Sequence, residues 1–184
     1  MITRLIRSRR PRRGAEQGAT AVEFAMVALP LFMMIMATLE LSMVVVVSTM
    51  LESALSKAAR EIRTGQQQNA SSSQSADVSE GAFVASVCSQ MVFLQSNCAS
   101  NLSVDVRVVN AWGTGGAPDP AAGGTFSDED LTFATGGPSE IVKVSAFYKW
   151  PLFTPYLSQA LSKVGNNTAL IRTVDTFRNE PYTS

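Results

Sequence analysis

The chain has 184 residues, enough for one domain or for a small domain with an appendage. Its 15 basic and 15 acidic side chains cancel, but the first 18 residues hold six arginines and one glutamate, which leaves −5 on the remainder. Because histidine is absent, a Ser-His-Asp or Cys-His catalytic unit and a histidine metal ligand are excluded. Two cysteines are too few for a four-cysteine zinc site or an iron–sulfur cluster. We therefore expect no catalytic residue, metal or cofactor.

A long apolar segment follows the arginine-rich start. Phe24 to Val47 is 24 residues long, and its non-apolar residues are Pro30, Thr38, Glu40 and Ser42. As a helix it would measure about 36 Å, enough to cross a hydrocarbon core of about 30 Å. A buried helix of a soluble protein is the alternative, but the remaining chain offers little core to hide it. The positive N-terminus should stay in the cytoplasm, which sends the C-terminal part across the membrane.

Two acids lie in or beside this segment, Glu23 and Glu40. An acid at mid-membrane costs about 2.5–3.5 kcal/mol, so it normally has a partner or a function. Glu23 can sit at the level of the lipid headgroups. Glu40 lies roughly 25 Å further along a straight helix. It is either an intramembrane acid or the outer end of a shorter span that begins near Ala19.

Small residues precede the apolar run instead of following it, so the A-x-A site of a secretory signal peptide is not found after it. The sequence Gly-Ala-Thr-Ala-Val-Glu-Phe, from Gly18 to Phe24, follows a basic leader and enters the apolar run directly. This arrangement resembles the processing site of type IV prepilins. The resemblance implies that an inner-membrane prepilin peptidase cuts between Gly18 and Ala19 on the cytoplasmic side, so that Glu23 becomes the fifth mature residue and Phe24 the sixth.

Processing at this site would bring two opposite charges within reach of each other. Glu23 lies one helical turn from the new α-amine of Ala19. Its carboxylate can pair with that amine in its own chain or in a neighbouring subunit. In a filament core, where water is scarce, the pair would offset two buried charges and fix the axial register.

The resemblance narrows when more of the chain is compared. The run from Gly18 to Phe32 with Glu40, the continuation 58–66 and the ending 177–182 are similar to TadE-like proteins. We expect this resemblance to cover nearly the whole chain. It implies a non-enzymatic minor pilin or pseudopilin of the tight-adherence (Flp) pilus, a bacterial machine of adhesion and biofilm formation. Mature residue one is an alanine here, where type IVa pilins have phenylalanine.

The same resemblance implies the location and the partners. The expected location is the inner membrane, with a single span, a cytoplasmic N-terminus and a periplasmic head. The expected partners are the prepilin peptidase, other pilins and pseudopilins of the Flp system, the inner-membrane assembly platform and the lipid bilayer, but not nucleic acid. The protein could enter the extracellular pilus, cap its tip or stay in the membrane, and the sequence does not choose among these.

Four segments are expected along the chain. They are a basic leader (1–18), a transmembrane and extended helix (19–64), a linker (65–78) and a head (79–184). Gly65 is placed to stop the helix, and the polar tract after it predicts a linker. The fold class is α+β: a long N-terminal transmembrane helix continuing into a small head with a short antiparallel sheet, pilin-like in outline.

Within the head, the patterns predict a helix over 79–95 and strands over 102–108, 142–150 and 168–177. They also predict a helix over 152–164, at least after Pro155. The third strand also fits a helical spacing. Residues 113–124 are expected to form a glycine-rich surface loop, and the acids at 128–130 a solvated turn. The first strand is expected to be half-buried, with Ser103, Asp105 and Arg107 toward solvent.

The two cysteines, Cys88 and Cys98, fall near the end of the first predicted head helix. An even pair in an exported segment predicts a disulfide, which would staple the helix end to the following chain. On the chain-entropy model it would add roughly 2–3 kcal/mol. Two free thiols would require a cytoplasmic location, which the charge asymmetry disfavours.

Two other functions fit parts of the pattern. An uncleaved single-pass adaptor or sensor would share the orientation and the disulfide but would not need Gly18 or Glu23. A minor pseudopilin of a type II secretion machine would share the cleavage logic, although Pro30, Glu40 and the C-terminal ending fit it less well.

Overall fold

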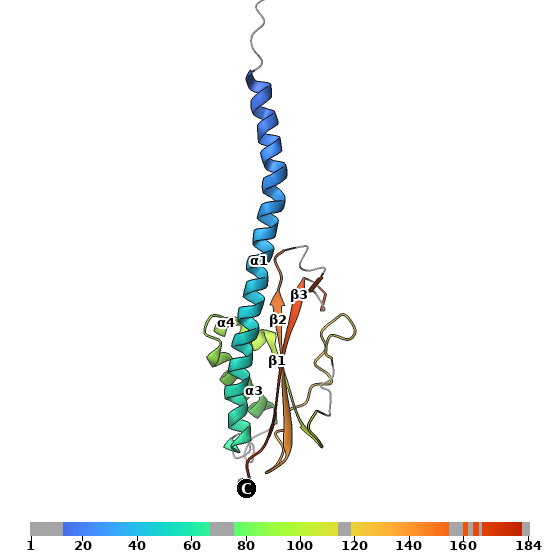
Figure 1. Cartoon of the computed structure of the whole chain (residues 1–184). Helices are drawn as coiled ribbons and strands as arrows, with labels where there is room; N and C mark the ends of the chain where they lie inside the picture. The colour runs from blue at the N-terminus through green and yellow to red at the C-terminus, as the bar shows by residue number, and fades with distance from the viewer. Residues whose placement is uncertain are drawn as a thin grey trace, which may run out of the picture.

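The computed structural model describes residues 13–66, 76–113, 119–154, 160–161, 164–165 and 167–181. Its elements are α1 (Arg13–Arg63), α3 (Ala76–Gln90), α4 (Gln95–Asn101), β1 (Leu102–Val109), β2 (Ile141–Pro151) and β3 (Thr168–Arg178). The strands form one antiparallel sheet in the order β1-β2-β3. Figure 1 shows α1 as a long rod that projects from a small head made of the sheet and the short helices. The predicted α+β class, with a long N-terminal helix and a small head, is confirmed.

Helix α1 has two halves with different surroundings. Between Val22 and Leu39 its large apolar side chains are exposed, including Phe24 (72% exposed) and Met26 (75%). The second half buries one face against the head through Val47, Leu51, Ala54, Leu55, Ala58, Ala59 and Ile62. These positions recur at steps of three and four residues, which is the spacing of one helical face. The sequence is therefore apolar all round in one half of α1 and amphipathic in the other.

The end of α1 follows the predicted stop. Gly65 has φ +79°, a conformation that a residue with a Cβ adopts only with strain. Its N–H donates to the carbonyl of Ile62 at 3.0 Å, and the N–H of Thr64 donates to that of Arg60 at 3.0 Å. The last turn is thus closed by backbone bonds, as in a glycine-terminated helix.

The predicted head helix over 79–95 is two helices in the structure. Helix α3 begins at Ala76 and ends at Gln90, and α4 begins at Gln95. The prediction failed because the apolar spacing continues through a turn in which Met91 donates to the carbonyl of Cys88 (3.1 Å) and Leu94 to that of Met91 (2.9 Å). These three-residue bonds are tighter than α-helical ones and redirect the chain.

The sheet carries α1 on one face. Figure 1 shows α1 running alongside the sheet, and alternate residues of each strand are buried toward it. They include Leu102, Val104, Val106, Val142, Val144, Ala146, Tyr148, Ile171 and Phe177. All three predicted strands are present, and the third is a strand and not a helix because it completes an eleven-residue ladder with β2.

The opposite face of the sheet differs from the prediction. Asp105, expected toward solvent, is fully buried, and so is Ser145 on the neighbouring strand. The connection between β1 and β2 returns to the edge of β1, where Val106 donates to the carbonyl of Thr132 (2.7 Å) and accepts from the N–H of Ala134 (2.8 Å). The second face of β1 is therefore only partly solvated: a loop that has no strand periodicity binds at Val106 and Asp105, while Ser103 and Arg107 stay partly exposed.

Two further predictions fall partly outside the described residues. The centre of the glycine-rich loop and most of the predicted helix 152–164 lie outside the described residues. Of that helix, Leu152 to Thr154 is non-helical, whereas Ala160 and Leu161 are helical. A proline disfavours the α conformation of the residue before it, and Thr154 precedes Pro155.

The end of the chain closes the head against α1. Asn179 is 2% exposed and donates its side-chain amide to the carbonyls of Thr135 and Gly137, each at 3.0 Å. The next residue, Glu180, donates its N–H to the carbonyl of Arg63 at 2.9 Å. The last described residues thus connect the end of α1 with the loop that precedes β2.

Candidate functional site

The predicted cleavage site lies in the first turns of α1. Gly18 is exposed, and a Cβ added to it would meet no atom within 4 Å. Ala19 is exposed as well. Glycine is the weakest helix former after proline, so a helix is easiest to open at such a position. Packing around position 18 therefore does not require a glycine. The fold itself does not explain why a glycine stands there.

Glu23 and Phe24 project from the exposed half of α1. Within the described part of the chain, the Glu23 carboxylate makes no hydrogen bond or ion pair. It lies four residues from Ala19, the spacing at which side chains of one helix face meet. The acid is thus available to an amine created at Ala19, in the same chain or in another.

Glu40 is placed quite differently. It is 8% exposed, while its neighbours Leu39 and Leu41 are about half exposed. Its two carboxylate oxygens accept the backbone N–H groups of Phe153 and Thr154, the latter at 2.9 Å. Residues Leu152 to Thr154, here called the β2 exit loop, follow β2 directly. The acid is therefore turned to the head and bound by it.

An apolar groove adjoins this contact, which we call the Glu40 groove. It has a volume of about 370 Å³ and is lined by Met36, Leu39, Glu40, Ser42, Met43, Val46, Trp150, Phe153 and Thr154. Within the described residues, the indole Nε1 of Trp150 and the hydroxyl of Thr154 are buried without a hydrogen-bond partner. The groove therefore joins the exposed half of α1 to the end of β2.

The sequence singled out Glu40 but not its partners. An acid inside an apolar helix signals that donors must exist. Nothing in the residues around Phe153 identifies them as those donors, because backbone N–H groups are common to all non-proline residues. The pairing joins positions 113 and 114 residues apart, so only the fold could reveal it.

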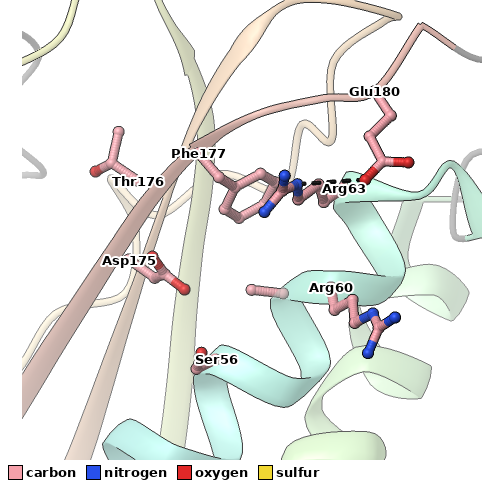
Figure 2. A pocket seen from close by; sticks show the side chains of 8 residues that line it. Ser56, Arg60, Arg63, Asp175, Thr176, Phe177 and Glu180 are labelled. Atoms are coloured by element: carbon pink, nitrogen blue, oxygen red, sulfur yellow. Dashed lines mark ion pairs between the residues drawn. The ribbon is translucent and has the colours of Figure 1, made fainter.

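A second groove lies at the other end of α1, between its last turns and β3 (Figure 2). Its volume is about 590 Å³. Arg63 Nε lies 3.5 Å from Glu180 Oε1, and both side chains are more than half exposed, so the pair contributes at most about 1 kcal/mol. Figure 2 shows Arg60 directed away from Asp175. Since the chain has no histidine, the hydroxyl of Ser56 in this groove has no imidazole to activate it.

The buried acid on β1 has a structural role. Asp105 accepts bonds from the guanidinium of Arg107, at 2.8 Å from Nε, and from the N–H of Thr132 at 3.1 Å. The hydrogen bond to Asp105 raises the pKa of Arg107, although burial acts in the opposite direction. A fixed positive charge thus compensates a buried negative one, and the cluster holds the β1–β2 connection to the sheet.

Cys88 and Cys98 form a disulfide, with their Cα atoms 5.6 Å apart. This separation lies within the usual range. Cys88 is in α3 and Cys98 in α4, so the bond fixes the turn between the two helices. The pair that the sequence predicts is the pair that the structure joins.

These features define an α+β protein in which a long apolar N-terminal helix continues into a small head. Among the described residues, α1 from Gly18 to Arg63 is the helix that is long and apolar enough to cross a membrane. The sequence model of the family described as TadE-like protein matches residues 18–60. The TadE-like resemblance is therefore confirmed over residues 18–60, which include Gly18, Ala19, Glu23, Phe24 and Glu40. The continuation at 61–66 and the C-terminal ending lie outside the matched residues.

No curated protein and no solved structure matches the chain. The likeness thus rests on residues 18–60 of the helix, and these comparisons assign no role to the head.

Proposed function

We propose that the chain is a minor pilin or pseudopilin of the tight-adherence pilus, which acts by assembly and not by catalysis. The observation that carries this proposal is the position of the Gly18–Phe24 motif at the exposed end of a TadE-like helix. A prepilin peptidase cuts after Gly18, and the other partners are pilins of the same system, the inner-membrane assembly platform and the bilayer. The head lies in the periplasm.

The two halves of α1 support this assignment. The exposed half contains four of the methionines, Met26, Met33, Met34 and Met36. Methionine is flexible and polarizable, so such a surface can pack first against lipid and later against neighbouring helices. The other half is occupied by the head. A subunit stored in a membrane and then transferred into a filament needs this division.

Glu40 then marks the outer end of the span. Ala19 to Leu39 comprises 21 residues, about 31 Å of helix, which matches a hydrocarbon core of about 30 Å. Of the two alternatives for this acid, the structure therefore favours the shorter span that starts near Ala19. The charge lies at the membrane boundary and is bound by the head.

The proposal is tested by the intact mass and N-terminus of the protein purified from the membranes of its own host. Cleavage removes 18 of 184 residues and lowers the mass of 19.7 kDa by roughly 2 kDa. A chain that begins at Ala19 supports the proposal. A chain that still begins at Met1, in a host with an active prepilin peptidase, favours the uncleaved adaptor or sensor instead.

Substitution of the cleavage glycine gives a sharper version of this test. Gly18→Ala and Gly18→Val should leave the precursor uncut, because the peptidase must approach the backbone closely. Gly81→Ala is the matched control, since Gly81 is also helical and a Cβ there also meets no atom within 4 Å. Immunoblotting separates the two chain lengths, and unchanged cleavage of the Gly18 variants would remove the motif from the argument.

A further inference from the structure

The β2 exit loop exposes one large apolar side chain. Phe153 is 79% exposed, whereas Leu152, directly before it, is 6% exposed. The N–H of Leu152 donates to the carbonyl of Asn167 at 2.7 Å, and those of the next two residues donate to Glu40. The backbone of the loop is thus held on both sides, and the Phe153 ring is presented outward by a fixed support.

The surface around this ring is apolar over two elements. Met36, Leu39 and Met43 reach it from α1, and all three are more than half exposed. The charged residue that lines the Glu40 groove is Glu40 itself, and its carboxylate oxygens accept hydrogen bonds from the backbone of the loop. A contiguous exposed apolar surface of this kind indicates a partner.

The position of the groove along α1 identifies that partner. This step rests on the membrane placement proposed above. If Ala19 to Leu39 fills the hydrocarbon core, Glu40 lies at its outer edge and the β2 exit loop at the same level. Figure 1 agrees, because the end of β2 is at the side of the head that faces the free half of α1. Tryptophan and tyrosine side chains are enriched at this level of membrane proteins, and Trp150 lines the groove.

We propose that the β2 exit loop docks the head on the outer leaflet of the bilayer, with Phe153 among the lipid acyl chains and lipid in the Glu40 groove. Trp150, which lines the groove from the end of β2, would lie on the head side of the same contact. Glu40 fixes the loop to the helix, so the span and the docked ring form one rigid unit. The head would then stand at a set angle on the membrane.

Another exposed aromatic residue provides the control. Phe93 is 82% exposed, in the turn between α3 and α4. Its neighbour Gln90 accepts a bond from the Lys57 ammonium at 3.4 Å. Lys57 is 17 residues beyond Glu40, which is about 25 Å further along α1. Phe93 is therefore as exposed as Phe153 but lies too far from the membrane to reach it.

The test places an environment-sensitive fluorophore at three sites of the full chain in vesicles of phosphatidylethanolamine and phosphatidylglycerol. Leu29→Cys reports on the span, Phe153→Cys on the loop and Phe93→Cys on the head. Labelling without reductant leaves the Cys88–Cys98 disulfide intact. Lipids with a spin label on the acyl chain then quench a fluorophore that touches them.

The proposal expects position 153 to be quenched several-fold more strongly than position 93, and nearly as strongly as position 29. Quenching at 29 with none at 153 would overturn the docking and leave the span in place. If the fluorophore at 153 emits as in an apolar environment but is not quenched by the labelled lipid, the proposal is also overturned, because a second protein would then occupy the groove. Absence of quenching at 29 would instead overturn the span itself.

Discussion

At the scale of single residues, the two acids of α1 illustrate how position decides role. Glu23 is exposed and is available to a charge from outside its own helix, whereas Glu40 is buried and bound by two backbone N–H groups. Both interrupt an apolar sequence, and both cost free energy in lipid unless they are compensated. The Glu40 carboxylate is stabilised by N–H groups of its own chain. For Glu23, the proposed partner is the amine that processing creates at Ala19.

Glu23→Ala should leave cleavage largely intact but impair pilus assembly. The residue lies beyond the scissile bond, and its loss removes the partner of the Ala19 amine. Pilus yield in the host, measured beside the cleaved fraction, checks this expectation. Glu16→Ala is the control, because that acid is discarded with the leader; wild-type piliation in the Glu23 variant would show that its carboxylate does not act in assembly.

Glu40→Ala should destabilise the contact between α1 and the β2 exit loop. It leaves two N–H groups without their acceptor, at about 1–3 kcal/mol for each one that stays buried. Hydrogen exchange of the Phe153 and Thr154 amides in purified protein should become faster. Glu40→Gln keeps an acceptor oxygen and should lose less.

Glu52→Ala provides the comparison, since Glu52 is an exposed acid on the same helix. If the amides of the loop exchange equally slowly in the Glu40→Ala variant and in this control, the carboxylate does not hold the loop.

At the scale of elements, α3 and α4 are separated by a turn that the apolar spacing alone did not predict. Phe83, Val87 and Met91 are fully buried, as their spacing indicates, yet the helix stops after Gln90. The disulfide spans this break, with Cys98 fully buried in the core. Two short helices that could not be stable alone are thus fixed to each other and to α1.

Replacing both cysteines, as Cys88→Ala with Cys98→Ala, should lower the free energy of unfolding by roughly 2–3 kcal/mol. The reason is the greater chain entropy of the unfolded state without the bond. Thermal unfolding with and without reductant measures it: reductant should destabilise the wild type and leave the variant unchanged. An equal response of both proteins to reductant, or detection of two free thiols in the unfolded, oxidised wild type, would contradict the prediction.

At the scale of the whole molecule, α1 combines the proposed membrane anchor in its first half with part of the core of the head in its second half. Its second half supplies the central face on which the sheet and α3 pack. The chain then closes on itself, because Asn179 and Glu180 return to the loop before β2 and to the end of α1. The head therefore cannot be regarded as a domain that folds apart from the helix.

Asn179→Ala should destabilise the whole head by roughly 1–3 kcal/mol, since two part-buried hydrogen bonds of a buried side chain are lost. Thermal or denaturant unfolding of the full chain measures this change. Asn110→Ala, at an exposed asparagine of the β1–β2 connection, should stay within about 0.5 kcal/mol of the wild type. Equal stability of the two variants would mean that the C-terminal closure contributes little.

The sequence by itself determined the features that depend on local pattern. The apolar run, Gly65 and the alternation in the strands predicted α1, its end and the three strands, because periodicity and backbone preference act between near neighbours. The motif from Gly18 to Phe24 likewise could be identified without coordinates. The disulfide could be predicted from the number of cysteines and the expected compartment alone.

Only the tertiary structure decided what depends on residues far apart in the chain. The burial of Asp105 follows from a loop without periodicity, and the binding of Glu40 follows from backbone groups more than 100 residues away. Backbone N–H groups carry no sequence signature, and long-range closure is set by the packing of the whole head. The contact of Glu40 with the head and the exposed ring of Phe153 became visible for that reason once α1, β2 and the β2 exit loop were placed together, and the proposed membrane boundary at Glu40 rests on them.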